Sequence, residues 1–507
     1  MPQQELLLAR SLPLSMVFSG GDSTSSCTRY YVLLLFAWLG TQQCLCWYTF
    51  GSIPSALSYF GLTTAEADAF ADLTMDWGAA GFVVSLPAAV YTVRRYGIRC
   101  SMRICGVLTF ACCLMRWLPC VLLATASSRK RWLWVLHVGS WLNAFVGAFY
   151  STACTTLSAT YFPPHQRTTA TAVGYMGGNL GMLLGYALGA LFGTPSNGLF
   201  GEAALPSLLL VELLLAVPAL ILVWPLPAPP RQRKSARTED ANAKADVEAG
   251  AAANAAAPPP VTLALFAREV GRALMQPSLL FLVAAGGIEA GANAAWGGLL
   301  PQIFATRWSK TTASRVANEC GLLNVSGSLL GMVLAGVVAD RCFRRRLKEM
   351  AMACFIASAA VTALVTAQFA TPWAHAPLWA APEVPVAVTL FIAGIFSGML
   401  DPLCLELAAE VGYPTSEATS SGLLTFAYNA AALLVLSLSP VLPTMWLNLG
   451  YAVVFILCAL LMLGVKALYG RTDAAAALVG KDAAAKVHLL ADVAAESGSA
   501  VDAVAAR

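Results

Sequence analysis

Residues 225–276 read PLPAPPRQRKSARTEDANAKADVEAGAAANAAAPPPVTLALFAREVGRALMQ and differ in composition from the sequence on either side. They begin with prolines, continue with four basic residues between positions 231 and 237, and then consist mainly of alanine and polar residues. Such a segment cannot bury enough apolar surface to offset the entropy lost on ordering, so we expect a flexible linker. The linker joins two strongly apolar regions, residues 29–224 and 277–470.

The composition of the chain excludes an ordinary soluble domain. It is 58% hydrophobic and only 11% charged over its 507 residues, whereas a soluble domain is about 25% charged. We predict a multi-pass integral membrane protein, in the plasma membrane or in an endolysosomal or other organelle membrane. The net charge of +4 is small, and the basic residues are spread over many short loops, so we expect no nucleic-acid partner. The 14 cysteines include no C-x-x-C pair with zinc spacing, so we expect neither a metal site nor a cofactor.

Each apolar region divides into segments long enough to cross a bilayer, for which a helix needs about 20 residues. The first region contains the segments 30–50, 73–93, 102–124, 132–156, 168–192 and 205–224. The second region contains the segments 277–300, 319–339, 349–370, 384–408, 420–442 and 446–468. The predicted fold class is an all-α membrane protein with twelve transmembrane helices in two pseudo-symmetric six-helix halves.

The distribution of Lys and Arg indicates the orientation, because these residues favour cytoplasmic loops. Of the 31 basic residues, one lies inside a predicted span and six lie in one set of loops. Those seven are Arg116 in the span, and Arg129, Lys130, Arg131, Arg307, Lys310 and Arg315 in the loops. All others lie in the second set, which includes the linker and the tails 1–28 and 471–507. We therefore predict that the linker and both tails are cytoplasmic.

Polar positions repeat between the two regions at an offset of 250 residues. The pairs are Arg167 and Glu417, Asn179 and Asn429, and Gln43 and Asn293. Transporters built from internal repeats hold their substrate between the repeats, near the bilayer midplane. The repeated set agrees with the division of the chain into two regions of six predicted spans each.

The segment 319–339 runs into Gly336-x-x-x-Asp340-Arg341-x-x-Arg344-Arg345-Arg346. We expect the glycine to permit close helix contact, and Asp340, Arg341 and Arg344 to form a charged lock at the cytoplasmic mouth. The loop resembles the signature loop of the major facilitator superfamily, and this resemblance implies the major facilitator fold. The corresponding first-half loop, residues 94–99, has an arginine where the acid is expected. A plain positively charged cytoplasmic loop is the alternative interpretation.

Glycines recur at helical spacing in two predicted spans. They are Gly174, Gly177, Gly178, Gly181, Gly185 and Gly189 in the fifth span, and Gly327 and Gly331 in the eighth. Small residues allow close contact between helices in lipid. In the superfamily these two helices face each other across the interface between the halves. Static packing and sliding at that interface both explain the pattern.

Charge inside a membrane span is costly and usually functional. Asn293 and Trp296 lie four and seven residues after Glu289, so the three share one helical face. A carboxylate beside tryptophan suits an amine or a flat polar heterocycle, through charge pairing and cation–π contact. Because burial disfavours the charged form of a carboxylate, Glu289 could instead carry a coupling proton. A permanent salt bridge to Arg116 is the third interpretation.

Other charged residues lie within or beside the predicted spans. They are Arg116, Glu212, Asp401, Glu406 and Glu410. An internal salt bridge between Arg116 and one of the acids would explain part of this set. Because Glu406 and Glu410 lie near the cytoplasmic end, we expect them to form a structural gate with Arg167 and Glu417.

Two longer segments carry a family resemblance. They are Ala159-Thr-Tyr-Phe-Pro-Pro-His-Gln-Arg-x-x-Ala-Thr-Ala-x-Gly174 and Glu406-x-x-x-Glu410-x-x-Tyr413-Pro414-x-x-Glu417-x-x-Ser420-Ser421-Gly422-Leu423-Leu424. Together with Arg29 and Trp47, they resemble the feline leukemia virus subgroup C receptor family of solute carriers. Residues such as His137, Gly139 and Asn143 make the disrupted-in-renal-carcinoma branch the most similar.

The resemblance implies a twelve-span carrier, and members of the family are linked to haem, to choline and ethanolamine, and to pyridoxine. Choline-type members use a tryptophan of helix 1, matched by Trp47, and a glutamine of helix 11, which is Asn429 here. Their helix 7 tyrosine falls at Ala294, and they have an uncharged residue where this chain has Glu289. Trp47 and the adjacent Tyr48 face either the cavity or the core.

We therefore expect a secondary, alternating-access transporter of a small organic nutrient, a vitamin or amine such as pyridoxine or choline and ethanolamine. Its expected substrate-binding residues are Gln43, Trp47, Glu289, Asn293, Trp296 and Asn429. Protons are a candidate coupling ion, and we expect a monomer. A haem or porphyrin transporter is one alternative, and a non-transporting receptor or scaffold is another. No nucleophile–base pair indicates an enzyme.

Overall fold

The computed structural model describes residues 23–123, 125–192, 204–227, 262–343, 345–369, 372, 377–379, 382–474 and 477, and these are almost entirely helical. The first region contains α2 (Ser23–Ser52), α3 (Thr64–Leu122), α4 (Ala126–Arg131), α5 (Leu133–Tyr161), α6 (Arg167–Phe192) and α7 (Ala204–Leu222), with the short 3-10 helices η2 (Pro54–Phe60) and η3 (Pro164–Gln166). The rest contains α9 (Leu263–Ala273), α10 (Pro277–Gly298), α11 (Leu300–Phe304), α12 (Lys310–Cys342), α13 (Leu347–Ala367), α14 (Glu383–Val411), α15 (Glu417–Leu438) and α16 (Thr444–Leu463).

Every predicted span falls on one of these helices, and α3 contains two of them. The two spans of α3 are separated at Gly97, whose φ of 78° is non-helical and is one that glycine adopts without strain. In the part of the chain that the structure describes, nine helices are long and apolar enough to cross a membrane. The all-α membrane fold is confirmed, whereas the count of twelve crossings stays a prediction.

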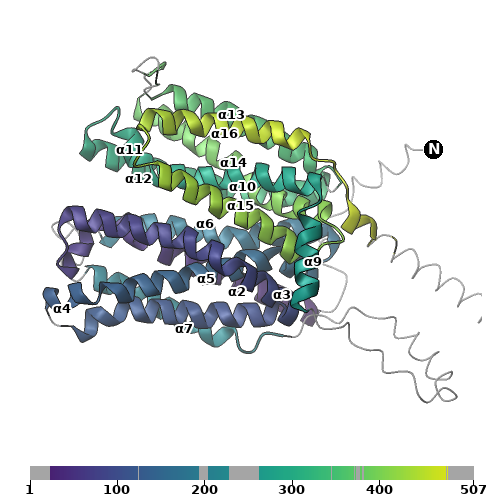
Figure 1. Cartoon of the computed structure of the whole chain (residues 1–507), viewed down its shortest axis with the longest axis horizontal. Coiled ribbons are helices and arrows are strands. Elements are labelled where there is room, and N and C mark those ends of the chain that lie inside the picture. The colour runs from purple at the N-terminus through teal and green to yellow at the C-terminus, as the bar shows by residue number, and fades with distance from the viewer. Residues whose placement is uncertain are drawn as a thin grey trace, which may run out of the picture.

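The helices form two bundles that lie side by side (Figure 1). We call α2–α7 the N-half and α10–α16 the C-half. Each half has its own apolar core, around Phe36, Leu86 and Val146 in the N-half and around Leu282 and Phe355 in the C-half. The halves meet through α6 against α12 and α14, and through α3 and α5 against α15. This is the arrangement in which a central site lies between the halves.

Helix α9 crosses from one half to the other at one end of the bundle, which we call the α9 end (Figure 1). It belongs to the segment predicted as a flexible linker, and for residues 262–276 that prediction is wrong. The reason is an apolar face: Phe266 is buried in the core of the N-half, with its ring centroid 5.8 Å from that of Tyr91. Residues 228–261 of the predicted linker lie outside the described residues.

The glycines of α6 and α12 make close contacts inside each half. A Cβ atom at Gly177 would lie 2.1 Å from the carbonyl oxygen of Ala37 in α2. One at Gly331 would lie 2.0 Å from the carbonyl oxygen of Ile395 in α14. These distances are too short for any side chain, so static packing within each half explains both glycines, although α6 and α12 do contact each other.

Candidate functional site

Three adjoining cavities lie between the halves. The largest of the three, lined by Glu289 and Asp401, has a volume of about 80 Å³, and we call it the acidic cavity. The second has no charged residue in its lining and a volume of about 60 Å³, and we call it the neutral cavity. The smallest has a volume of about 20 Å³. Tyr175 of α6 and Tyr428 of α15 line all three, so one aromatic residue from each half forms their shared wall. Ligand pockets usually measure roughly 300–1,000 Å³, so each of these cavities is smaller than an ordinary ligand pocket.

Two carboxylates face the acidic cavity, Glu289 of α10 and Asp401 of α14, and both also line the smallest cavity. The side chain of Glu289 is buried, with 2% of its residue surface exposed, and its Oε1 atom has no hydrogen-bond partner among the described residues. The residues that line the three cavities include no Lys, Arg or His. The site therefore presents unbalanced negative charge, or carboxyl groups that hold their protons.

Asn293 and Trp296 also line the acidic cavity, together with Glu289. Tyr451 of α16 donates a hydrogen bond to Asn293 Oδ1 at 2.7 Å, and the ring of Tyr451 stacks on Trp296 with centroids 4.4 Å apart. Trp296 Nε1 donates to Asn448 Oδ1 at 3.4 Å. Trp296 is thus held rigidly in the packing of the C-half and presents only a small part of its ring to the cavity.

The neutral cavity is lined by Gln43 and Trp47 of α2 and by Asn429 of α15. Trp47 Nε1 donates to the carbonyl oxygen of Met75 at 3.2 Å, which fixes the indole against α3. Gly78 makes room for that ring, because a Cβ atom there would lie 2.2 Å from Nε1. The predicted binding residues are therefore divided between two adjoining cavities.

Asp340 joins the halves at the α9 end, but through partners other than those predicted. Its carboxylate accepts hydrogen bonds from the backbone N–H groups of Thr168, at 3.3 Å, and Thr169, at 2.8 Å. These are free N–H groups in the first turn of α6, where the helix dipole favours a negative charge. Arg341 is exposed and is not among the hydrogen-bond partners of Asp340 in the described residues. Arg344 lies outside the described residues, so its part in a lock stays a prediction.

Close packing supports this contact. A Cβ atom at Gly336 would lie 2.9 Å from the Cα atom of Thr169, so only glycine allows α12 and α6 to approach this far. The role predicted for the small residue of the signature loop is confirmed.

Glu406 and Glu410 of α14 lie buried at the same end. Glu406 accepts hydrogen bonds from Ser158 and Thr171 of the N-half, the former at 3.1 Å. Arg471, which follows α16, donates to Glu406 at 2.5 Å and to Glu410 at 3.1 Å. Burial disfavours the charged guanidinium, but the two carboxylates outweigh it and raise the pKa of Arg471 above its usual value. Arg471, assigned to the tail from sequence, is therefore part of the closed end.

The predicted gate residues Arg167 and Glu417 occupy equivalent places, as the first residues of α6 and α15. Arg167 is repelled by the neighbouring Arg471 and attracted by the carboxylates of Glu406, Glu417 and Glu410. Thr155 of α5 donates to the backbone oxygen of Glu417 at 3.3 Å, which adds a further link between the halves.

Glu269 of α9 also connects the two halves. It pairs with Arg94 of the N-half and accepts hydrogen bonds from the C-half, from Ser416 N at 2.7 Å and Thr419 Oγ1 at 3.1 Å. Burial alone would raise the pKa of Glu269, but the bonds from Ser416 and the charge of Arg94 outweigh burial and lower it. Arg94 occupies the place of the missing acid in the first-half loop, and the linker helix supplies its carboxylate partner.

The other intramembrane charges neutralise each other. Arg116 of α3 and Glu212 of α7 form an ion pair at 3.1 Å, buried in the N-half. Arg116 also donates to the carbonyl oxygen of Cys46 at 2.9 Å and lies 4.4 Å from the ring centroid of Phe50. The predicted internal salt bridge is confirmed with Glu212 as partner, so the salt bridge of Arg116 to Glu289 is wrong.

Sequence reasoning missed several residues of the cavities. Tyr175, Asn179 and Tyr428 line two or three cavities each, and Asp401 lines two. The repeat pair of Asn179 with Asn429 and the intramembrane charge of Asp401 were usable signals. Nothing in the local pattern distinguishes the two tyrosines from packing residues. Among the described residues, the side chains grouped closely enough to share a metal ion are Cys46, Cys112 and Cys113, which lie away from the cavities.

Comparison with known proteins identifies the class. The Major Facilitator Superfamily matches residues 39–434, and the chain belongs to that family. A proton:xylose symporter bound to 6-bromo-6-deoxy-D-glucose has the same fold, with a TM-score of 0.62 and 15% identity over 89% of this chain and 99% of that one. The protein is thus a multi-pass membrane transporter for a small molecule and not an enzyme.

Two of the most similar relatives belong to one group of solute carriers. A solute carrier family 49 member 4 homolog from Xenopus tropicalis is 25% identical over 429 residues, 79% of this chain and 82% of that protein. The choline/ethanolamine transporter FLVCR1 from Felis catus is 23% identical over 415 residues, 80% of this chain and 66% of that protein. These matches confirm the resemblance to the feline leukemia virus subgroup C receptor-related solute carriers.

Proposed function

We propose that this protein is an alternating-access carrier for a small organic cation. The candidates are the quaternary ammonium of choline, the ammonium of ethanolamine, and the protonated pyridine ring of pyridoxine. The observation that carries the proposal is the pair Glu289 and Asp401, which face cavities lined by aromatic residues and by no basic side chain. A buried carboxylate without a cationic partner is expensive, and a cationic substrate would supply that partner. The names of the choline/ethanolamine relatives favour the same chemistry.

The bonds at the α9 end support alternating access. Asp340 and Glu406 of the C-half accept hydrogen bonds from the N-half. Glu269 of α9 bonds to both halves, so this end of the molecule is closed. We propose that the α9 end faces the cytoplasm, because α9, which belongs to the predicted cytoplasmic linker, lies there with the basic residues Arg94 and Arg471. The structure then corresponds to a conformation closed toward the cytoplasm, and transport requires these bonds to break.

Glu289 has one of two roles in this proposal. As a direct contact, it pairs with the cation. As a coupling group, it exchanges a proton during the cycle, and Asp401 in the same cavity is its natural partner. Glu289→Gln distinguishes them: coupling predicts that accumulation driven by a pH gradient disappears while substrate exchange survives, and direct binding predicts that both are lost.

The proposal is tested by uptake into proteoliposomes that contain the purified full-length protein, with and without a pH gradient. Choline, ethanolamine, pyridoxine and haem form the panel. We expect uptake of at least one of choline, ethanolamine and pyridoxine, and we expect this uptake to be reduced in Glu289→Gln. Haem carries two carboxylates, which the acidic cavity would repel, so uptake of haem alone would refute the proposed function.

A further inference from the structure

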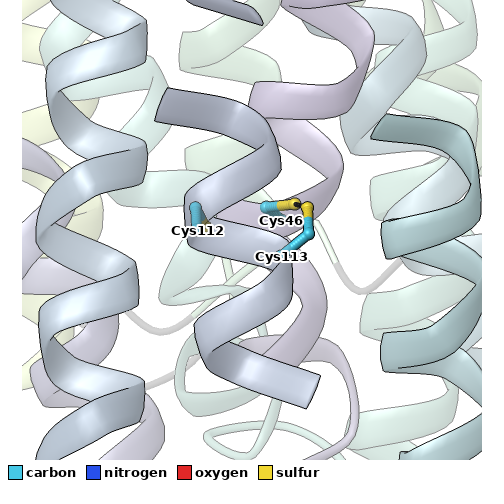
Figure 2. Close-up of side chains that lie close together, drawn as sticks. All are labelled: Cys46, Cys112 and Cys113. Atoms are coloured by element: carbon cyan, nitrogen blue, oxygen red, sulfur yellow. Dashed lines mark hydrogen bonds between the residues drawn. The ribbon is translucent and has the colours of Figure 1, made fainter. Parts of the chain in front are cut away.

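Three cysteines converge inside the N-half, apart from the central cavities: Cys46 of α2 with Cys112 and Cys113 of α3. Their sulfur atoms all lie within 4.8 Å of one another, and those of Cys46 and Cys113 are 3.5 Å apart. Figure 2 shows the Cys46 and Cys113 sulfur atoms facing each other between the two helices. We propose that this cluster binds a soft, thiophilic metal ion, Cu(I), between α2 and α3.

The geometry suits such an ion without movement of the backbone. A metal–thiolate bond is about 2.3 Å long, so three sulfurs around one ion are separated by roughly 4 Å. Thiolate ligands select Cu(I), Zn²⁺ or iron–sulfur clusters among the metals. Structural zinc sites almost always have four ligands, whereas this cluster offers three sulfurs and no imidazole, which favours Cu(I).

The surrounding groups favour thiolate sulfur. Gln42 Nε2 donates to the sulfur of Cys113 at 3.5 Å and to that of Cys46 at 3.8 Å. Such outer donors orient and stabilise metal-bound ligands. Arg116 is 1% exposed, and its Nε and Nη2 atoms have no hydrogen-bond partner among the described residues. Although Arg116 is paired with Glu212, these two unused donors leave the guanidinium able to stabilise further negative charge on the sulfur atoms.

The charges balance when the ion binds. Counted from three protonated thiols, with Arg116 cancelling Glu212, the group is neutral before the metal binds. Cu(I) then forms bonds to the three sulfurs, and two of the thiols lose their protons. The thiol of Cys46 donates to Glu212 Oε2 at 3.6 Å, so this carboxylate is placed to take one proton, and the other leaves to water. The copper does not change oxidation state, and the group is neutral before and after, which matters because net charge inside a membrane is costly.

The bound ion would tie α2 to α3 inside the N-half. Both helices belong to the same bundle, so the link does not oppose the movement of one half against the other. Its expected effect is on stability, because a ligand that binds only the folded state stabilises that state. This role is separate from transport and does not depend on the substrate.

The test measures metal in full-length protein purified without chelators from cells grown with added copper. We expect one copper per chain by mass spectrometry and copper–sulfur scattering in X-ray absorption. We also expect the copper-loaded protein to have a higher unfolding temperature than the copper-free protein. The variant Cys112→Ala/Cys113→Ala should lose the copper and the shift. Cys105→Ala is the matched control, because Cys105 is also a buried cysteine of α3 but lies outside the cluster, so this variant should keep the copper.

A variant that preserves folding keeps the test decisive if the double change unfolds the protein. Cys46→Ser retains a hydroxyl donor for Glu212 but replaces a soft ligand with a hard one. We expect a monodisperse protein without copper. Copper at the wild-type level in Cys46→Ser, a copper-free wild type, or zinc bound in place of copper would each overturn the proposal.

Discussion

Both halves of the molecule bury carboxylates among membrane-spanning helices, but they treat the charge differently. In the N-half, Glu212 is paired with Arg116 at 3.1 Å and sealed in a core. In the C-half, Glu289 and Asp401 face a cavity whose lining contains no basic residue. The comparison shows that burial of a charge does not by itself identify a functional residue. The two sites differ in whether a counter-charge lies beside the acid: Arg116 is paired with Glu212, and no basic residue lines the acidic cavity.

The largest expected effect is on the paired site. Removing one partner of a buried ion pair costs about 3–5 kcal/mol, because the other charge is left uncompensated. Arg116→Met should therefore lower the expression and the unfolding temperature strongly. The double variant Arg116→Met/Glu212→Gln removes both charges and should recover most of the stability. A single variant as stable as the wild type would mean that the pair is not a structural element.

The unpaired site should respond in the opposite way. Glu289→Gln and Asp401→Asn remove charge that nothing in the protein compensates, so we expect unfolding temperatures equal to or above that of the wild type. A lost contact between charged groups costs about 1.5–3 kcal/mol, so the apparent substrate constant should rise about tenfold to a hundredfold. Uptake kinetics and thermal unfolding of the same preparations measure both quantities. Loss of folding with no change in substrate affinity would place these acids in the same class as Glu212.

A smaller effect is expected at Asp340, whose charge is compensated by a helix N-terminus. Asp340→Asn weakens the two bonds to the first turn of α6, which stabilise the closed α9 end, so turnover should slow while expression persists. Hydrogen exchange of the Thr168 and Thr169 amides, which donate those bonds, should be faster in the variant. Arg341→Gln is the control. Because Arg341 is exposed, this variant should leave the turnover rate and the amide exchange rates unchanged. Equal exchange in Asp340→Asn and the wild type would contradict this role.

The smallest expected effect concerns Glu269 of the linker helix. Because the pKa of Glu269 is lowered in the folded protein, its contribution to stability is complete above the usual pKa of a glutamate and is lost as the pH falls from there through the lowered pKa. Each hydrogen bond contributes about 1 kcal/mol, so Glu269→Gln should lower the unfolding temperature slightly at neutral pH. The difference from the wild type should shrink as the pH falls below the usual pKa of a glutamate. A difference that grows on acidification would show that the pKa is raised instead.

Features set by neighbouring residues could be predicted from the sequence, whereas contacts between residues far apart in the sequence could not. Hydropathy located the long helices, and helical spacing placed Glu289, Asn293 and Trp296 on one face, because both depend on local sequence. The partner of Arg116 could not be chosen from several acids, since it is set by the packing of α3 against α7. Arg471 was missed because it follows the last span and its partners lie about sixty residues earlier in α14. Helix α9 was missed because its few buried residues hardly change the average composition of a segment that is otherwise polar.

The most direct test of the central claim compares choline with its uncharged isostere, 3,3-dimethylbutan-1-ol, as competitors for substrate uptake into proteoliposomes. The two molecules have nearly the same shape and differ in the positive charge. We predict that choline competes at least about tenfold more strongly, as one charge-assisted contact would require, and that Glu289→Gln/Asp401→Asn abolishes this preference. Equal competition by the two compounds in the wild type would contradict the claim that the acidic cavity recognises a cation.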